Sequence, residues 1–379
     1  MVVHERSGSL TGALTSALLF GAGAVAGYEY LSGPLPARSE VPREAPGVDA
    51  EDAFTVGLAR TPDARGHLRA VVARRDGAWS RSCEGAGALS EPRIAASPSG
   101  AVVLALTFQG AVDCGAGAIV AAGGAGDFDA LVAGLDRRGK VRWTVTASDL
   151  GAQTIAAVAV DPWGNALVTG SFEGTVELGG APMTADSPRD VLLAKLDADG
   201  QLVWQRHFGG AERSFGVDVD VTRTGRVLLL ARGTGAIDFG DGARRDAGAT
   251  AFLAAFEADG RPAWSRSFGG DGEIAPSKVR AIPGNQIFVS GTFSGTADLE
   301  AGPVSSAGRS DAFLLRLDGV GRPLASARIG SIFAEEPRAA ADPPRSADVD
   351  PSLARRLRAL IDEIGAGPPE GSDASASRR

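Results

Sequence analysis

The sequence feature that most constrains the fold is a long internal repeat. The segment "LDADGQLVWQRHFGG" at 196–210 returns as "FEADGRPAWSRSFGG" at 256–270. A tryptophan column with nearly even spacing runs through Trp79, Trp143, Trp204 and Trp264. One period after Trp264 the chain has Leu324, and glycines keep the same period. A chain that repeats a unit of this size builds one substructure several times.

Each unit contains four strand-like segments, which in the best-preserved copy are 155–160, 165–172, 191–196 and 202–208. Turn residues separate them, and the Asp-Gly pair before the last segment is typical of a tight hairpin. We expect Trp204, Arg206 and Phe208 to share one face of the sheet with Leu192 and Ala194 on the neighbouring strand. Both faces are partly apolar, which suits a sheet packed between two others.

Four-stranded units repeated around an axis form a β-propeller. We therefore expect an all-β fold over residues 51–330 with about five four-stranded blades. Four blades is the alternative, because the second hairpin of the unit occurs five times but the first hairpin four times. The alternating segment Phe54 to Leu58 is a candidate for one missing strand. A β-solenoid would have shorter repeats and no bulky tryptophan column.

The units also resemble a known repeat. The stretches "GNALVTGSFEGTVELGG…DVLLAKLDADGQLVWQRHFGG" and "NQIFVSGTFSGTADLEAGPVSSAGRSDAFLLRLDGVGRP" are similar to the bacterial SBBP-type β-propeller repeat, over about residues 67 to 330. Proteins with such repeats are mostly exported and have no assigned biochemical role. The resemblance thus implies a fold and a compartment, and leaves the activity open.

Both ends of the chain differ from the repeat. Residues 1–26 contain an uncharged apolar stretch, 10–26, that ends in Ala-Val-Ala, which is typical of a signal peptide, with a membrane anchor as the alternative. Residues 27–50 and 331–350 have the composition of linkers. Residues 351–365 carry an apolar stripe at helical spacing, so we expect a short amphipathic helix that packs on the propeller or, through 352–364, supports self-association. Residues 366–379 are expected to be disordered.

Charge and composition exclude several classes of function. The net charge is −8 and no basic run is present, which argues against a nucleic-acid partner. The three histidines, His4, His67 and His207, occupy unrelated positions, so we predict no catalytic residue, no metal site and no cofactor. The "DADG" segment at 197–200 lacks the further acids of a calcium loop and is interpreted as a turn.

One set of carboxylates leaves two interpretations open. Each unit has an acid at the same register: Asp113, Glu177, Asp238 and Asp298. Side chains of this kind beside a glycine usually hold a loop by accepting backbone N–H groups. If they pointed toward the propeller axis, they would instead surround a cation or a polar ligand.

The two cysteines occupy repeat columns that are apolar in the other units. Cys83 stands in the column of Phe208 and Phe268, and Cys114 in the column of Phe239 and Leu299, with the same offset between the two columns in every unit. We therefore predict a Cys83–Cys114 disulfide in place of an apolar contact such as Phe208–Phe239, with two buried thiols as the alternative.

These observations predict an extracytoplasmic β-propeller in the periplasm, at the cell surface or secreted. Its expected function is that of a non-catalytic interaction or scaffold module for an unknown protein or glycan. One alternative is a propeller enzyme of lyase or glycoside hydrolase type, which would need non-repeated polar residues at one end of the central channel. A second alternative is a membrane-tethered structural or sensory component that contacts the bilayer through residues 10–26.

Overall fold

The structure, a computed structural model, consists of strands and turns in the residues that it describes. These residues are 54–60, 68–96, 100, 102–122, 128–148, 151–210, 212–244, 249–299, 302–306 and 310–329. Within these ranges no helix is long and apolar enough to span a bilayer. The predicted signal or anchor (1–26), the linkers (27–50 and 331–350), the helix (351–365) and the tail (366–379) lie outside the described residues.

In the described ranges, twenty-seven strands form five successive antiparallel sheets and one separate hairpin. The first sheet is built on β1 (Phe54–Arg60), β2 (Leu68–Arg74) and β3 (Ser80–Gly85). The second contains β4 (Arg93–Ala96), β5 (Val102–Phe108), β8 (Asp129–Leu135) and β9 (Val141–Ser148). The third contains β10 (Gln153–Val160), β11 (Ala166–Phe172), β14 (Asp190–Leu196) and β15 (Leu202–Phe208). The fourth contains β16 (Ser214–Val221), β17 (Val227–Thr234), β20 (Ala249–Phe256) and β21 (Pro262–Gly270). The fifth contains β22 (Ile274–Ile282), β23 (Gln286–Phe293), β26 (Asp311–Asp318) and β27 (Pro323–Ile329).

A short hairpin between the second and third strands of a unit accounts for much of the length of each repeat. Its first strand pairs with the last strand of the preceding sheet in three cases: β6 (Ala111–Asp113) with β3, β12 (Thr175–Leu178) with β9, and β24 (Thr296–Asp298) with β21. The returning strands are β7 (Ala118–Val120), β13 (Met183–Thr184) and β25 (Pro303–Ser305). The fourth such hairpin, β18 (Ile237–Asp238) and β19 (Ala243–Arg244), forms a sheet of its own. Three of the glycine-rich segments therefore cross-link consecutive sheets.

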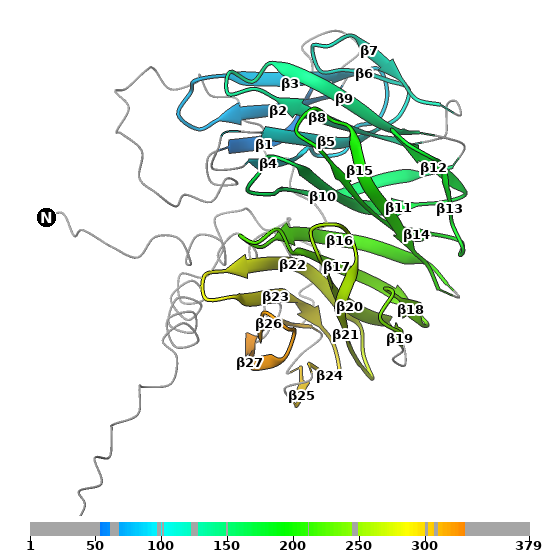
Figure 1. The fold of residues 1–379 in the computed structure, drawn as a ribbon, viewed down its shortest axis with the longest axis vertical. Helices are drawn as coiled ribbons and strands as arrows, with labels where there is room; N and C mark the ends of the chain where they lie inside the picture. The colour runs from blue at the N-terminus through cyan, green and yellow to red at the C-terminus, as the bar shows by residue number, and fades with distance from the viewer. Residues whose placement is uncertain are drawn as a thin grey trace, which may run out of the picture.

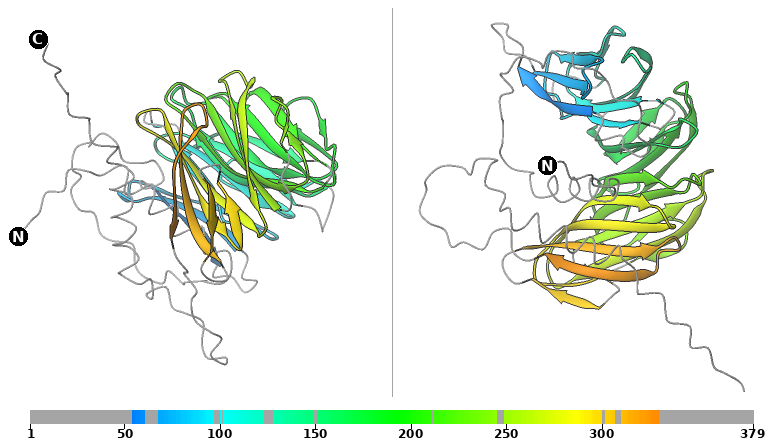
Figure 2. Two further views of the ribbon diagram at one scale, coloured as in Figure 1. Left: turned by 90° about the horizontal axis from the view of Figure 1, so that it is seen from below. Right: turned by 90° about the vertical axis from the view of Figure 1, so that its left-hand side faces the viewer.

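The sheets stack along an arc in chain order, with the first and the fifth sheet at its two ends (Figures 1 and 2). Strands β5, β8, β11 and β14 are buried at every position, because each lies in a sheet that has a neighbour on both faces. Their near-continuous apolar sequences follow from this two-sided packing. The all-β prediction and the strands of the third sheet are confirmed, and Phe54 to Leu58 lies in β1 as expected.

The predicted face of Trp204 was wrong. Trp204 pairs with Lys195 and Arg206 with Leu193, so these side chains share a face with Val191 and Leu193. Leu192 and Ala194 face the other way, into the core between the second and third sheets. The reason is a β-bulge between Lys195 and Leu196, which inserts one residue after the turn and reverses the alternation.

The repeated tryptophan and glycine columns form contacts between consecutive sheets. Each tryptophan ring lies against the turn glycine of the next sheet, at a distance of 2.5–2.8 Å from a Cβ built there: Trp79 on Gly139, Trp143 on Gly200, Trp204 on Gly260 and Trp264 on Gly321. Hydrogen bonds reinforce the contact. Trp143 Nε1 donates to Ala198 O at 2.9 Å, and Arg266 Nε donates to Gly321 O at 2.8 Å. We call this arrangement the tryptophan–turn contact.

The tryptophan–turn contact stops at the two ends of the arc. Ala325, and not Leu324 as the simple count predicts, is the structural equivalent of Trp264, because Leu324 is the bulge residue of its hairpin. At the other end, a Cβ built on Gly77 would meet no atom within 4 Å. Among the described strands no ladder joins the first sheet to the fifth. A closed ring and the number of blades therefore stay predictions.

Candidate ligand-binding cavity

The repeated carboxylates lie on the short hairpins, away from the stacked first strands. Asp113 Oδ1 accepts hydrogen bonds from Gly115 N at 2.7 Å and Gly117 N at 3.2 Å. Asp238 Oδ1 accepts the equivalent bonds from Gly240 N at 2.7 Å and Gly242 N at 3.1 Å. Both aspartates therefore hold their loops, which is the first of the two interpretations. Glu177 and Asp298 occupy the same register on β12 and β24 and are exposed.

The turn interpretation of "DADG" is supported as well. Asp197 Oδ1 accepts from Asp199 N at 2.9 Å and Gln201 N at 2.8 Å, and Gly200 has a φ of +83°. The side chain thus stabilises the same turn that receives Trp143. This accounts for the Asp-x-x-Gly pattern in the repeat without a ligand.

The disulfide prediction agrees with the structure. The sulfur atoms of Cys83 and Cys114 lie 2.06 Å apart, and the bond links β3 to the segment after β6. In the third and fourth units the equivalent residues Phe208 and Phe239 are in ring contact, with centroids 5.0 Å apart. The disulfide therefore replaces an apolar contact between sheets. It is compatible with an oxidising compartment.

His207 takes part in a cluster that sequence reasoning missed. Its Nδ1 lies 2.9 Å from Oδ2 of the buried Asp190 and 4.0 Å from Oδ2 of the exposed Asp186. In the fifth sheet the equivalent pair is Arg328 and Asp311, at 3.0 Å. Because an arginine occupies the equivalent position and cannot bind a metal, we interpret the cluster as a hydrogen-bonded pair that holds a buried aspartate. The Asp column Asp129, Asp190 and Asp311 was the signal in the sequence.

A second group of charges lies on the first strands of the fourth and fifth sheets. Asp218 Oδ2 accepts from Val279 N at 2.9 Å and from Arg280 Nη1 at 3.1 Å. Asp220 Oδ2 accepts from Ala281 N at 2.7 Å. These carboxylates satisfy the backbone N–H groups on the edge of β22, which has no partner on that side among the described strands.

Burial raises the pKa of Asp220 to about 6, although Arg280 and the backbone N–H groups of Ala281 and Val221 oppose the shift. A carboxyl with such a pKa is a feature of many acid–base sites. Here both oxygens already accept backbone hydrogen bonds. The equivalent residues in the third sheet are alanines, so the repeat pattern gave no signal for this group.

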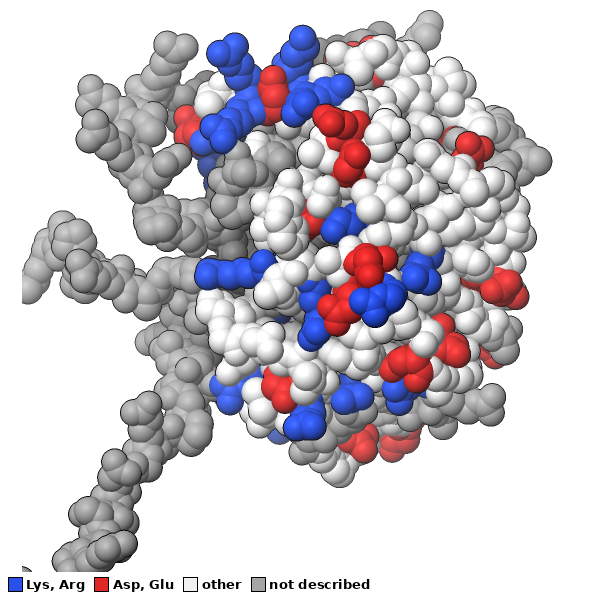
Figure 3. All heavy atoms as spheres, in the orientation of Figure 1, with Lys and Arg blue, Asp and Glu red and all other residues white. Residues whose placement is uncertain are grey.

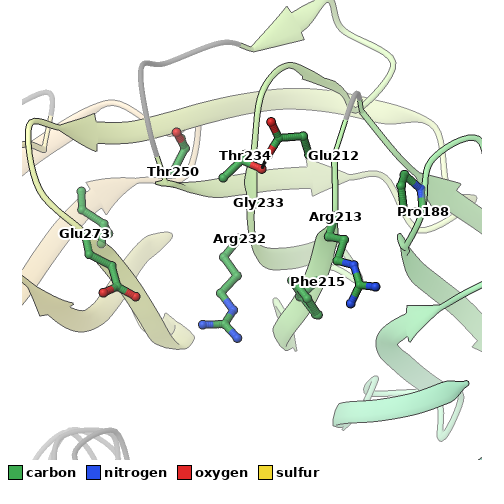
Figure 4. Close-up of a pocket in the computed structure, with 10 residues that line it drawn as sticks. Pro188, Glu212, Arg213, Phe215, Arg232, Gly233, Thr234, Thr250 and Glu273 are labelled. Carbon is green, nitrogen blue, oxygen red and sulfur yellow. Dashed lines mark hydrogen bonds between the residues drawn. The ribbon is translucent and has the colours of Figure 1, made fainter.

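An open cavity among the described residues has a volume of about 580 Å³ and lies where β16 and β22 begin and β17 ends. This is the end of the strands opposite the Asp-x-x-Gly turns, and we call it the connection end. The cavity is lined by Pro188, Glu212, Arg213, Phe215, Arg232, Gly233, Thr234, Thr250, Glu273 and Ile274 (Figure 4). None of these residues is among the predicted site residues.

Phe215 and Arg232 form one wall of the cavity, and Arg189 lies beside the ring outside the lining. Phe215 and Arg232 are directly opposite each other on β16 and β17, and the Arg232 guanidinium lies 5.1 Å from the ring centroid. Arg189 lies 5.4 Å from the same centroid, but its charge is paired with Glu173 at 2.6 Å. The side chains of Arg213, Phe215 and Arg232 extend in the same direction in Figure 4.

The cavity presents two guanidinium groups and two carboxylates around a flat apolar ring. Arg232 is exposed, and the side chain of Arg213 is 61% exposed with Glu173 at 3.8 Å. Guanidinium groups bind carboxylates with two parallel hydrogen bonds. The described residues that line the cavity include no histidine or cysteine, and its two carboxylates, on Glu212 and Glu273, are exposed. Thr234 donates a hydrogen bond to Glu212.

Comparison with known proteins adds little to this geometry. No protein-family model matches the chain, and no curated protein matches it. Among solved structures, a mutant of the Synechocystis apocarotenoid oxygenase is similar with a TM-score of 0.31 and 12% identity, over 70% of this chain and 73% of that one. A TM-score this low supports no conclusion about the function of this chain or its number of blades. The resemblance to the SBBP-type repeat stays a sequence-based prediction.

Proposed function

We propose that this protein is an exported, non-catalytic β-propeller module that binds a protein or glycan partner through the cavity at the connection end. The partner presents a carboxylate or a similar anionic group next to a flat apolar surface. The anion pairs with Arg232 and Arg213, and the apolar part contacts Phe215. The disulfide supports an oxidising, extracytoplasmic location.

The observation that carries the proposal is that Phe215 and Arg232 break the repeat. The equivalent cross-strand pairs are Thr154 with Ser171 in the third sheet and Ala275 with Thr292 in the fifth. Small residues therefore satisfy the fold at these positions. An exposed arginine against an aromatic ring is typical of binding hot spots, because the ring restricts the guanidinium and shields its contacts from water.

The experiment compares anionic and neutral ligands. Binding of oligogalacturonate and of a Glu-rich peptide is measured by calorimetry, with neutral dextran as the reference. We expect binding of at least one anionic probe, and a loss of about 10- to 100-fold with Arg232→Gln, as for one charge-assisted pair. Phe215→Thr introduces the residue of the third sheet and should also weaken binding. Arg261→Gln, in a turn at the opposite end of the strands, is the matched control.

Two results would overturn the proposal. One is equal binding of dextran and the anionic probes, and the other is unchanged binding by both cavity variants. Cleavage products from oligogalacturonate would instead support the lyase or glycoside hydrolase alternative, for which Glu212 and Glu273 are the available carboxylates. Intact-mass analysis of membrane and soluble fractions tests the tethered alternative, which requires residues 1–26 to stay on the chain.

A further inference from the structure

A basic surface lies at the turn end of the first two sheets, opposite the cavity. It consists of six exposed basic side chains on two adjacent turns and the strand ends beside them: Arg74, Arg75, Arg81, Arg137, Arg138 and Lys140. The tryptophan–turn contact joins the turns, since Trp79 lies on Gly139 and Arg81 Nε donates to Gly139 O. Lys and Arg side chains gather in this region at the top of the molecule (Figure 3). We call these six residues the basic turn patch.

The patch keeps a net positive charge despite two aspartates. Arg74 Nε is paired with Asp76 at 2.9 Å. Asp136 accepts hydrogen bonds from Lys140 N and Arg138 N, and these bonds lower its pKa, so it stays ionised. Six basic groups and two acids leave a charge of +4 on a chain whose total is −8.

The fold does not require these basic residues. The turn at 136–140 reads Asp-Arg-Arg-Gly-Lys, whereas its equivalent at 197–201 reads Asp-Ala-Asp-Gly-Gln. Both turns have the same Asp side-chain hydrogen bonds and the same glycine with positive φ. Replacing the three basic residues with those of the third sheet therefore changes the charge from +2 to −2 without changing the turn.

We infer that the basic turn patch docks on an anionic lipid bilayer. Arginine and lysine bind lipid phosphates through charge-assisted hydrogen bonds. The patch lies on the two sheets closest in sequence to the uncharged stretch 10–26, and the segment 27–53 connects that stretch to β1. An extended segment of that length reaches about 90 Å, which is enough to let the patch meet the surface. When residues 10–26 stay on the chain, as the tethered alternative requires, this proximity favours a membrane over a soluble polyanion.

The strength of the effect follows from the charge. Each basic residue near an anionic surface strengthens binding about fivefold, so four net charges give an increase on the order of 600-fold. Salt screens the interaction, because the Debye length falls from about 10 Å at 0.1 M to about 3 Å at 1 M. The inference does not depend on the ligand of the cavity.

The test measures co-sedimentation of the full chain with vesicles. One set contains phosphatidylglycerol and phosphatidylcholine at 3:7 (about 30% anionic lipid) and the other phosphatidylcholine alone. The variant Arg137→Ala/Arg138→Asp/Lys140→Gln carries the turn sequence of the third sheet. Its control, Arg261→Gln/Arg322→Gln, removes two arginines from the equivalent turns of the fourth and fifth sheets.

We expect preferential binding to the anionic vesicles that falls with salt, a loss of that preference in the patch variant, and no change in the control. Equal binding to both vesicles would overturn the inference, as would full anionic preference in the patch variant. Retention on heparin without preference for anionic vesicles would assign the patch to a soluble polyanion and would also overturn it. Circular dichroism of the variants verifies that each has folded.

Discussion

The tryptophan–turn contact predicts that the same glycine substitution has different costs in two turns. Gly200 and Gly77 occupy the same turn position with φ values of +83° and +74°. A Cβ on Gly200 would lie 2.7 Å from the ring of Trp143, whereas a Cβ on Gly77 would meet no atom within 4 Å. Gly200→Ala therefore adds a steric conflict to backbone strain, and Gly77→Ala adds strain alone.

The costs of backbone strain and of the steric conflict can be estimated separately. An alanine in the left-handed region costs about 1–2 kcal/mol in either turn. Overpacking against a ring that cannot move away costs a further amount of about 1–3 kcal/mol at Gly200. Trp143 is held in place by its hydrogen bond to Ala198 O, so the ring gives way less easily than a surface side chain. We expect Gly200→Ala to lower the free energy of unfolding by about 2–5 kcal/mol and Gly77→Ala by about 1–2 kcal/mol.

The assay is urea unfolding followed by tryptophan fluorescence and by circular dichroism, with both variants also made in a Trp143→Ala background. If the ring causes the extra cost, Gly200→Ala in that background costs as little as Gly77→Ala, and the double-mutant cycle gives a coupling energy of about 1–3 kcal/mol. Equal costs for the two glycines in the wild-type background, or no coupling to Trp143, would refute the reasoning.

Three further predictions concern the disulfide and two carboxylates. Denatured, unreduced protein should show no free thiol, and two titratable thiols per chain would disprove the bond. The variant Cys83→Ala/Cys114→Ala should lower the free energy of unfolding by about 3–4 kcal/mol, as expected for a closed loop of 31 residues. Burial raises the pKa of Asp220 from 3.8 to about 6, so the folded state binds the proton more tightly than the unfolded state does. The contribution of this group to the free energy of unfolding is therefore complete below about pH 4 and is lost as the pH rises through 6. Asp220→Asn should flatten that pH dependence and raise the unfolding free energy at pH 7.5 by at most about 3 kcal/mol, measured by thermal unfolding from pH 4 to 8; an undiminished slope in the variant would contradict it. His207→Arg should preserve the pair with Asp190, since Arg328 forms the same pair with Asp311 in the fifth sheet. If His207→Arg lowers the melting temperature at pH 8 as much as His207→Ala does, the two pairs are not equivalent.

Predictions from the sequence succeeded where the chemistry is local or repeated. The Asp-x-x-Gly turns follow from positive φ at glycine and from an Asp side chain that accepts N–H groups two and four residues later. The Cys83–Cys114 pairing followed from a constant offset between two columns. In both cases a property of neighbouring residues or of the period carries the information.

The faces of the strands were harder to predict. Alternation placed Leu192 and Ala194 beside Trp204, and one bulge residue, Val203, reversed the assignment. The fifth sheet has the same bulge at Leu324, so the equivalent of Trp264 is Ala325, four residues after Gly321 as Trp264 is four residues after Gly260. A bulge depends on how two strands pair, so a pattern read along one strand does not contain it.

The amino-acid sequence by itself determined the repeating unit, its turns, its all-β class and its cysteine pairing, because these depend on residues related by a fixed spacing. The tertiary structure alone decided which groups meet across strands and across sheets. It brought Arg232 over Phe215 at the cavity, placed Asp218 and Asp220 against the edge of β22, and joined two turns into the basic turn patch. Phe215, Arg232, Asp218 and Asp220 break the repeat, and the contacts between sheets depend on how neighbouring sheets stack, which no period in the sequence specifies.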